Sequence, residues 1–173
     1  MIILVTGASG SGKTTLASVL TTELHFPMLS LDVLKEQLYD LLPAPEPPVQ
    51  DWAQVLGHTA VHLLLNVARK YKNVIVDAVL SASDAQQQQA IEKLGPVVEV
   101  HCQVSAKEAQ RRFSIRTQQG RHAVHAWLPE LSLEQWQQNA APITDNALIV
   151  NTTNPLHQEE VTKLAAHLIL VRR

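Results

Sequence analysis

The sequence predicts an α/β fold in which a parallel β-sheet is flanked by helices. Short apolar runs alternate with longer segments of helical periodicity along most of the 173 residues. The first apolar run leads directly into a glycine-rich loop, and a helical pattern follows that loop. Two of the β-branched runs, at 73–77 and 147–151, end in a polar residue, as expected where strands meet an open edge. Alternation of this kind favours a parallel sheet because parallel strands need helical crossovers.

The individual elements follow from these patterns. Strands are predicted at 2–6, 27–31, 73–77, 97–104 and 147–151. Helices are predicted at 13–25, 33–41, 52–71, 82–94, 106–118, 133–138 and 155–171. Ser105 and Ser132 are predicted N-caps, the former with Glu108 three residues later. The proline-rich stretch 43–48 breaks the chain, and its position in so short a chain indicates a rigid surface loop rather than a domain linker.

Residues 7–14 form the most specific motif of the chain. They read Gly-x-x-x-x-Gly-Lys-Thr between an apolar run and a helical segment, which is the context of a phosphate-binding loop. Glycines allow the backbone to wrap around phosphate oxygens, and the N–H groups of the loop then point at the anion. Lys13 can reach the β- and γ-phosphates, and the Thr14 hydroxyl can ligate Mg²⁺. We therefore predict that this loop binds ATP or GTP together with Mg²⁺. The residues predicted to contact the nucleotide are Gly7, Ala8, Ser9, Gly10, Ser11, Gly12, Lys13, Thr14 and Thr15.

Composition and charge narrow the class of protein. A chain of 173 residues fits one domain, and we predict a single domain over 1–173. The net charge of −2 argues against a broad basic surface for nucleic acid or an anionic membrane. The single cysteine, Cys102, excludes an intramolecular disulfide and a cysteine metal site. Without a signal-peptide pattern or a membrane-length apolar run, the prediction is a cytoplasmic protein.

Two carboxylates are predicted to lie beside the phosphate loop. Asp32 follows the second strand and Asp77 ends the third, so both belong at the carboxyl edge of the sheet, where ligands bind. Asp32 can cap the next helix and can also accept a proton from a substrate hydroxyl. Asp77 can hold Mg²⁺ through water or bind the acceptor. An N-cap and a strand-end turn residue are the competing structural interpretations.

Four arginines lie within eleven residues, at the end of the predicted helix 106–118 and just beyond it. Arg112 and Arg116 are four apart and share one helix face, while Arg111 is better explained as a solvated basic residue. A helix with arginines that ends at Gly120 and continues into a loop is typical of a lid, which we place at about 112–130. Arg116 and Arg121 are then candidates to neutralise charge on a transferred phosphoryl group.

Taken together, these motifs resemble the small P-loop kinases of the predicted-kinase AAA type. That group is related to chloramphenicol phosphotransferase, zeta-toxin kinases and the kinase domain of polynucleotide 5′-kinases. The resemblance spans nearly the whole chain, and its carriers are 7–14, 30–35, 74–77, the Arg112-Phe-x-x-Arg116 pair, 120–122 and 151–155. It implies a three-layer P-loop NTPase fold with a five-stranded parallel sheet in the order 2-3-1-4-5 and a lid.

The resemblance also implies transfer of phosphate from ATP to a hydroxyl, with Asp32 as the base. The implied catalytic residues are Lys13, Asp32, Arg116 and Arg121. Arg112 and Thr153 would contact the nucleotide, Asp32, Lys35 and Asp77 the acceptor, and Thr14 and Asp77 the metal. The chain departs from the group at Ala123-Val124, where a Pro-Gly turn is usual, and at Lys35, where many polynucleotide kinases carry arginine. Lysine is a point charge and cannot make the bidentate grip of arginine.

The leading hypothesis is therefore a kinase for a small-molecule hydroxyl acceptor. A polynucleotide 5′-hydroxyl kinase is the first alternative, but the acidic net charge counts against a basic groove for the strand. A nucleotide-dependent switch with slow hydrolysis is the second alternative. The sequence predicts neither the acceptor's identity nor the oligomeric state.

Overall fold

The computed structural model describes residues 1–44, 52–118, 122–125, 136 and 141–171. Within these residues, five strands form one sheet in the order β2-β3-β1-β4-β5. All of the strand pairs are parallel. The strands are β1 (Ile2–Thr6), β2 (Met28–Ser30), β3 (Val74–Asp77), β4 (Val97–Gln103) and β5 (Leu148–Asn151). The predicted fold class and strand order are thereby confirmed.

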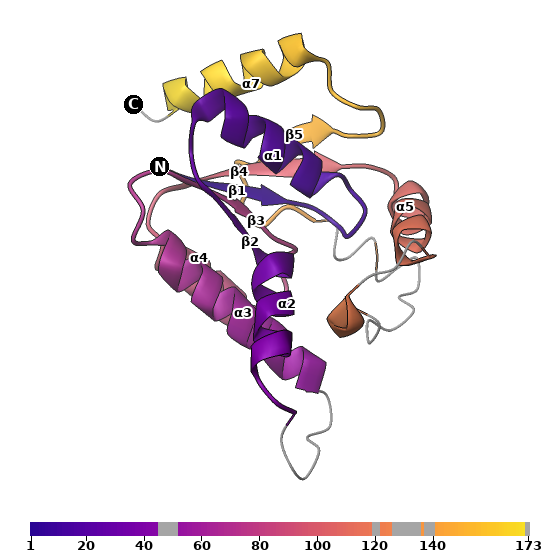
Figure 1. Ribbon diagram of the computed structural model, residues 1–173. Helices are drawn as coiled ribbons and strands as arrows, with labels where there is room; N and C mark the ends of the chain where they lie inside the picture. The colour runs from indigo at the N-terminus through magenta and orange to yellow at the C-terminus, as the bar shows by residue number, and fades with distance from the viewer. Residues whose placement is uncertain (45–51, 119–121, 126–135, 137–140, 172–173) are drawn as a thin grey trace.

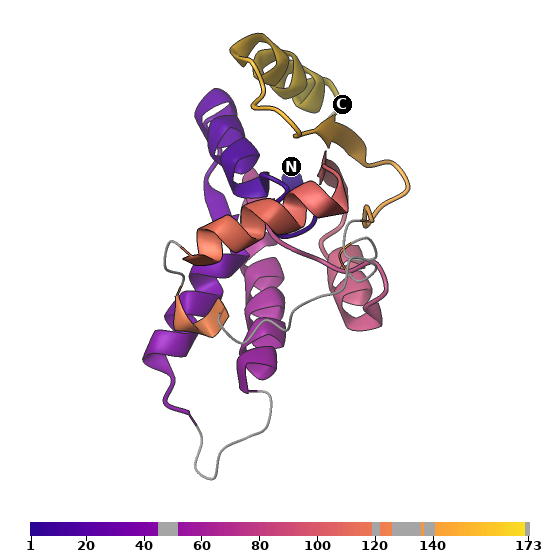
Figure 2. The same cartoon turned by 90° about the vertical axis from the view of Figure 1, so that its right-hand side faces the viewer.

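Helices cover both faces of the sheet and one of its edges. Figure 1 shows α1 (Lys13–Leu24) and α7 (Gln158–Val171) on one face, with α2 (Leu31–Leu41), α3 (Trp52–Ala68) and α4 (Ala85–Glu92) on the other. The N-terminus and the last turn of α7 lie near the amino ends of the strands (Figure 1). In the turned view, α5 (Ala106–Gln118) crosses in front of the carboxyl edge (Figure 2). The short 3₁₀-helix η1 (Ala123–His125) lies beside α2 at this edge. The carboxyl ends of the strands, where the predicted site residues lie, are therefore flanked by α2 and α5.

The core explains why β1 is central. All five of its residues are buried, because both faces of a doubly covered parallel sheet are packed. Ile3 and Val5 pack with the residues of α1 and α7, while Ile2 and Leu4 pack with those of α3 and α4. This alternation is the two-residue period of a strand. It fixes where the strand ends and hence where the glycine-rich loop begins.

The starts of α2 and α4 differ from the sequence prediction. Helix α2 begins at Leu31 rather than at 33, so Ser30 occupies the N-cap position and Asp32 lies in the first turn. The N-cap interpretation of Asp32 is therefore wrong, although its carboxylate still meets the positive end of the helix. Helix α4 begins at Ala85 rather than at 82, because the Asp84 carboxylate accepts hydrogen bonds from the N–H groups of residues 86 and 87.

The remaining boundaries lie within three residues of the prediction or fall outside the described residues. Glu108 N–H donates to the Ser105 hydroxyl at 3.2 Å, which confirms the predicted cap of α5. Helix α3 ends at Ala68 and α7 begins at Gln158, three residues inside each predicted limit of 71 and 155. Most of the predicted helix 133–138, its cap Ser132 and most of the loop 43–48 lie outside the described residues. The limits of the lid and the single-domain assignment stay predictions.

A buried carboxylate interrupts the apolar pattern of β4. Glu99 is 1 % exposed and pairs in register with Leu4 of the central strand. Its oxygens accept hydrogen bonds from the N–H groups of Ile143 and Thr144, from the Thr144 hydroxyl and from the Thr6 hydroxyl. Burial would raise the pKa of Glu99, but the hydrogen bonds from His101 and these other donors outweigh it and lower the pKa to about 2. Glu99 thus ties the returning segment at 143–144 to the core.

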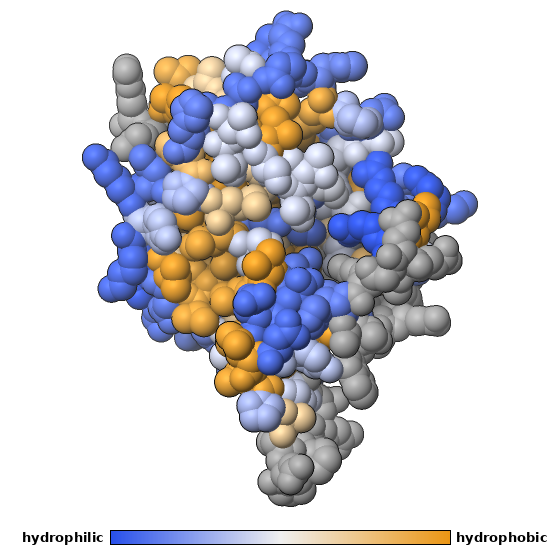
Figure 3. Space-filling model, in the orientation of Figure 1, coloured by the Kyte–Doolittle hydropathy of each residue, from blue (hydrophilic) through white to orange (hydrophobic). Residues whose placement is uncertain are grey.

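The surface adds two observations. Figure 3 shows apolar side chains gathered over α3, and the exposed large apolar residues of α2 and α3 include Val33, Leu63 and Val67. Among the helices of the described part of the chain, none is long and apolar enough to cross a membrane.

Candidate active site

The phosphate loop is shaped by glycines that no other residue can replace without strain. Gly7, Gly10 and Gly12 have φ values of 130°, 84° and 90°, a region that residues with a Cβ rarely adopt. A Cβ on Gly10 would lie 2.1 Å from the carbonyl oxygen of Ala109 in α5. A Cβ on Gly7 would lie 2.6 Å from the carbonyl oxygen of Cys102 in β4. The loop therefore needs glycine both for its dihedrals and for the close approach of β4 and α5.

Lys13 lies inside this loop, at the first residue of α1. Its ammonium donates to the carbonyl oxygen of Ala8 at 2.9 Å, and the residue is only 8 % exposed. Burial lowers the pKa of Lys13, while the charges of Asp77 and Asp32 act to raise it and the charge of Arg116 acts to lower it. Three of the predicted site residues, Asp32, Asp77 and Arg116, thus lie within electrostatic reach of the Lys13 ammonium group, although they are far apart in the sequence.

Asp77 connects the phosphate loop with β2 and β3. Its Oδ2 accepts a hydrogen bond from the Thr14 hydroxyl at 2.8 Å and a longer one from the Ser30 hydroxyl at 3.5 Å. Burial raises the pKa of Asp77, while the Thr14 hydrogen bond and the charge of Lys13 act in the opposite direction. The residue is only 4 % exposed, so its carboxylate is shielded from bulk solvent.

The residues fit a bound nucleotide with a divalent cation. The Thr14 hydroxyl and the Asp77 carboxylate offer hard oxygen donors at the helix start, which is the donor type that Mg²⁺ prefers. The Ser11 hydroxyl is buried without a hydrogen-bond partner among the described side chains, and it lies 2.7 Å from the position of a Cβ on Gly7. A buried polar atom of this kind is usually satisfied by a ligand or water.

Of the other predicted site residues, Asp32 and Lys35 lie on α2, and the predicted catalytic residue Arg116 lies at the end of α5. Asp32 is exposed in the first turn of α2, facing the charge of Lys13. Lys35 extends along α3, and its Cε lies 3.8 Å from the position of a Cβ on Gly57. Arg116 lies in the last turn of α5 and is exposed. The predicted catalytic residue Arg121 lies outside the described residues.

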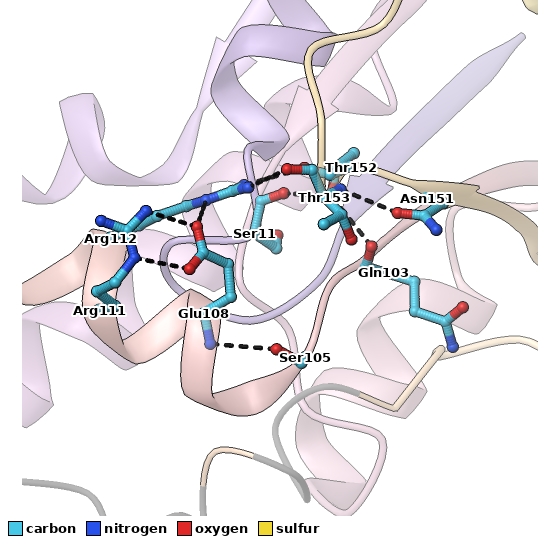
Figure 4. A network of polar contacts seen from close by, with 9 residues as sticks. All are labelled: Ser11, Gln103, Ser105, Glu108, Arg111, Arg112, Asn151, Thr152 and Thr153. Carbon is cyan, nitrogen blue, oxygen red and sulfur yellow. Dashed lines mark hydrogen bonds and ion pairs between the residues drawn. The ribbon is translucent and has the colours of Figure 1, made fainter.

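Arg112 and Thr153, which the resemblance assigns to the nucleotide, contact each other. Arg112 donates from Nη1 to the carbonyl oxygen of Thr152 at 3.0 Å and from Nη2 to that of Thr153 at 2.6 Å. Its Nε donates to Glu108 at 2.8 Å, and Glu108 also pairs with Arg111 (Figure 4). All three nitrogen atoms of the Arg112 guanidinium therefore donate hydrogen bonds to protein oxygens. These bonds connect α5 to the turn after β5.

Two histidines of the predicted lid contact α2. His125 Nε2 lies 2.9 Å from Glu36, and His122 Nε2 lies 3.0 Å from Asp40. The sequence analysis assigned neither histidine a role or a partner. A signal was present, because Asp32, Glu36 and Asp40 recur every four residues and so form one acidic face of α2. No group of three metal-binding side chains occurs among the described residues, His58 and His62 included.

A family model described as an AAA domain matches residues 2–143. The chain belongs to this AAA-domain family. No curated protein matches it at a significant level.

Similar solved structures include a candidate kinase from Chloroflexus aurantiacus, which is 25 % identical with a TM-score of 0.75 over 96 % of each chain. A gluconokinase from Sinorhizobium meliloti is 15 % identical with a TM-score of 0.58, over 99 % of this chain and 97 % of that one. A shikimate kinase from Acinetobacter baumannii, in complex with shikimate, is 17 % identical with a TM-score of 0.56, over 98 % and 91 %. At such identities the gluconokinase and the shikimate kinase show a shared fold, which is that of P-loop kinases.

Proposed function

We propose that this AAA-domain protein is an ATP-dependent phosphotransferase that moves the γ-phosphate of ATP to a hydroxyl of a small-molecule acceptor. The proposal includes a relation to chloramphenicol phosphotransferase, zeta-toxin kinases and polynucleotide kinases. It also includes the preference for ATP, the use of Mg²⁺, a cytoplasmic location and the roles of the site residues. The gluconokinase and the shikimate kinase of the same fold support a small hydroxyl compound as the acceptor class.

One observation carries the proposal. Lys13 is within electrostatic reach of the carboxylate Asp32 on α2, the carboxylate Asp77 on β3 and the guanidinium of Arg116 on α5. A phosphate held by Lys13 would therefore lie near an exposed carboxylate and an arginine. This is the arrangement that phosphoryl transfer needs, because its catalysis consists largely of positioning and charge stabilisation.

Each residue then has a defined task. The loop amides and Lys13 hold the phosphates, and Asp32 orients the acceptor hydroxyl toward the γ-phosphorus. The acceptor oxygen forms a bond to that phosphorus, its proton passes to the Asp32 carboxylate, and the bond to the bridging oxygen breaks to release ADP. Arg116, and Arg121 from the lid, offset the charge on the transferred group. Lys35 on the same helix as Asp32 would contact the acceptor, with Arg112 and Thr153 at the nucleotide.

Thr14 and Asp77, which already share a hydrogen bond, would hold Mg²⁺, Asp77 through water; contact of Asp77 with the acceptor is the alternative role. When bound, the ion would neutralise phosphate charge. The buried carboxylate of Asp77 matches this task because an ion would stabilise its charged form, which burial alone disfavours.

The test is ATP turnover with Mg²⁺ against a panel of hydroxyl acceptors that includes sugars, sugar acids, nucleosides and a 5′-hydroxyl oligonucleotide. We expect turnover to depend on one class of small acceptor. Asp32→Asn should reduce that transfer by about 100-fold or more while ADP affinity changes less than about twofold. Asp40→Asn, two turns along the same face, is the matched control and should retain transfer. Equal slow hydrolysis with every acceptor, unaffected by Asp32→Asn, would contradict the proposal and favour a switch.

A further inference from the structure

Thr152, the first residue after β5, lies where three parts of the site meet. Its N–H donates to the carbonyl oxygen of Gln103 at the end of β4, at 2.9 Å. Its hydroxyl lies 2.6 Å from the carbonyl oxygen of Ser11 and 3.2 Å from that of Gln103. The residue is 8 % exposed, so these contacts are shielded from water. The shorter contact joins the turn after β5 to the middle of the phosphate loop (Figure 4).

The same residue holds α5 through its own carbonyl group. The Thr152 oxygen accepts a hydrogen bond from Arg112 Nη1 at 3.0 Å, while Nη2 reaches the next carbonyl along the chain. A guanidinium that binds two carbonyls with its fork has a fixed orientation, since the group is planar. Glu108 takes the remaining Nε–H at 2.8 Å and keeps the side chain extended in that direction. The position of α5 near Arg112 therefore depends on the position of Thr152.

Helix α5 also carries Arg116, one turn beyond Arg112 on the same face. The charge of Arg116 reaches Lys13 in the phosphate loop. The loop and this helix also approach each other directly, because the Cα of Gly10 lies against the Ala109 carbonyl with no space for a side chain. A displacement of the phosphate loop at Ser11 would thus be transmitted to α5 through Thr152, whose hydroxyl contacts the loop and whose carbonyl contacts Arg112.

From these contacts we propose that Thr152 is a positioning residue that couples the phosphate loop to helix α5. Its hydroxyl holds the loop at Ser11, its carbonyl holds Arg112, and nucleotide binding in the loop thereby fixes Arg116. The role of Arg116 in transfer rests on the proposed function, but the coupling between the loop and α5 does not. A nucleotide-binding experiment can therefore test it without any acceptor.

The first part of the test removes only the hydroxyl. Thr152→Val keeps the shape of the side chain but leaves the buried Ser11 carbonyl without this donor. We expect the dissociation constant for ADP with Mg²⁺, measured by calorimetry, to rise by about 10-fold. Thr152→Ser restores the hydroxyl and should bind within about twofold of the original protein. Thr22→Val is the matched control, because the Thr22 hydroxyl bonds only a carbonyl of its own helix, at 3.3 Å, and it should bind ADP unchanged.

The second part is a double-mutant cycle with Arg112→Ala. If both contacts belong to one chain of interactions, the double variant should weaken ADP binding by clearly less than the product of the two single effects. Multiplicative effects would overturn the coupling, and so would a Thr152→Val protein that binds ADP as tightly as the original. If Thr152→Ser failed to restore ADP affinity, the loss in Thr152→Val could not be assigned to the missing hydroxyl. That result would count against the proposed role of the hydroxyl, because a general folding defect would affect both variants. Absence of transfer to any acceptor, with the coupling intact, would refute the proposed function alone.

Discussion

The two sides of the candidate site are built in different ways. The phosphate side is held by backbone: glycines at positive φ, a lysine bonded to a carbonyl within its own loop, and a direct approach of loop and helix α5. The acceptor side is held by side chains from separate elements, such as the His125–Glu36 pair between η1 and α2. The first arrangement is rigid because sterics fix it, while the second depends on charge and on the position of the lid. The predictions below separate these two kinds of control.

The largest effect is expected from Gly10→Ala. The added Cβ would meet the Ala109 carbonyl at 2.1 Å and would also strain a φ of +84°. We expect the affinity for ADP with Mg²⁺ to fall by roughly 100-fold, because the loop or α5 must move. Calorimetry measures the affinity, and thermal unfolding shows whether the fold survives.

A matched control separates the clash from the dihedral. Gly95 has a similar φ of +80°, but a Cβ there would meet nothing within 4 Å. Gly95→Ala should therefore cost only the strain of the left-handed region, about 1–2 kcal/mol of stability, and leave ADP binding unchanged. If both variants bound ADP equally well, the close approach of loop and helix would not control the phosphate side.

These contrasts also explain which parts of the molecule the sequence predicts. The phosphate loop is predicted because its chemistry is local, within eight residues and the strand and helix that flank them. Asp32 and Asp77 are predicted because parallel strands end at one edge. Thr152 and Glu99 are not, since their partners lie 141 and 44 residues away along the chain. Nothing in the pattern of β4 indicates that a glutamate there would be buried, and only the packing of 143–144 against it reveals this.

An intermediate effect is expected from Glu99→Gln, which changes a buried contact remote from both sides. The folded pKa of about 2 lies below the ordinary value of 4.5, so the stability from ionised Glu99 is complete above pH 4.5 and declines as the pH falls toward 2. We expect the variant to lose on the order of 3 kcal/mol at pH 7 and to approach the original protein's stability at acid pH. Urea unfolding between pH 3 and pH 7 measures this difference.

Glu159→Gln is the control for Glu99, because Glu159 pairs only with Lys163 on the exposed surface of α7. Its effect should be within about 0.5 kcal/mol and nearly independent of pH. A pH-independent difference between Glu99→Gln and the original protein would contradict the role given to the ionised carboxylate.

The smallest effect, and the most selective, is expected on the acceptor side. His125 is buried against the half-exposed Glu36, whereas the His122–Asp40 pair is more open to solvent. Replacing His125 by alanine should cost about 1–2 kcal/mol of stability, because a packed ring is lost and Glu36 loses its partner. His122→Ala should cost less than about 0.5 kcal/mol, since exposed pairs contribute little.

The His125→Ala variant also tests the acceptor side by kinetics. Because this substitution removes a contact between the predicted lid and α2, it should raise the KM of the acceptor without changing ADP affinity. Because the phosphate side is fixed by its own backbone, a fall in ADP affinity in His125→Ala would show that the two sides are not independent. The contrast between backbone and side-chain control would then apply to the loop alone and not to the site as a whole.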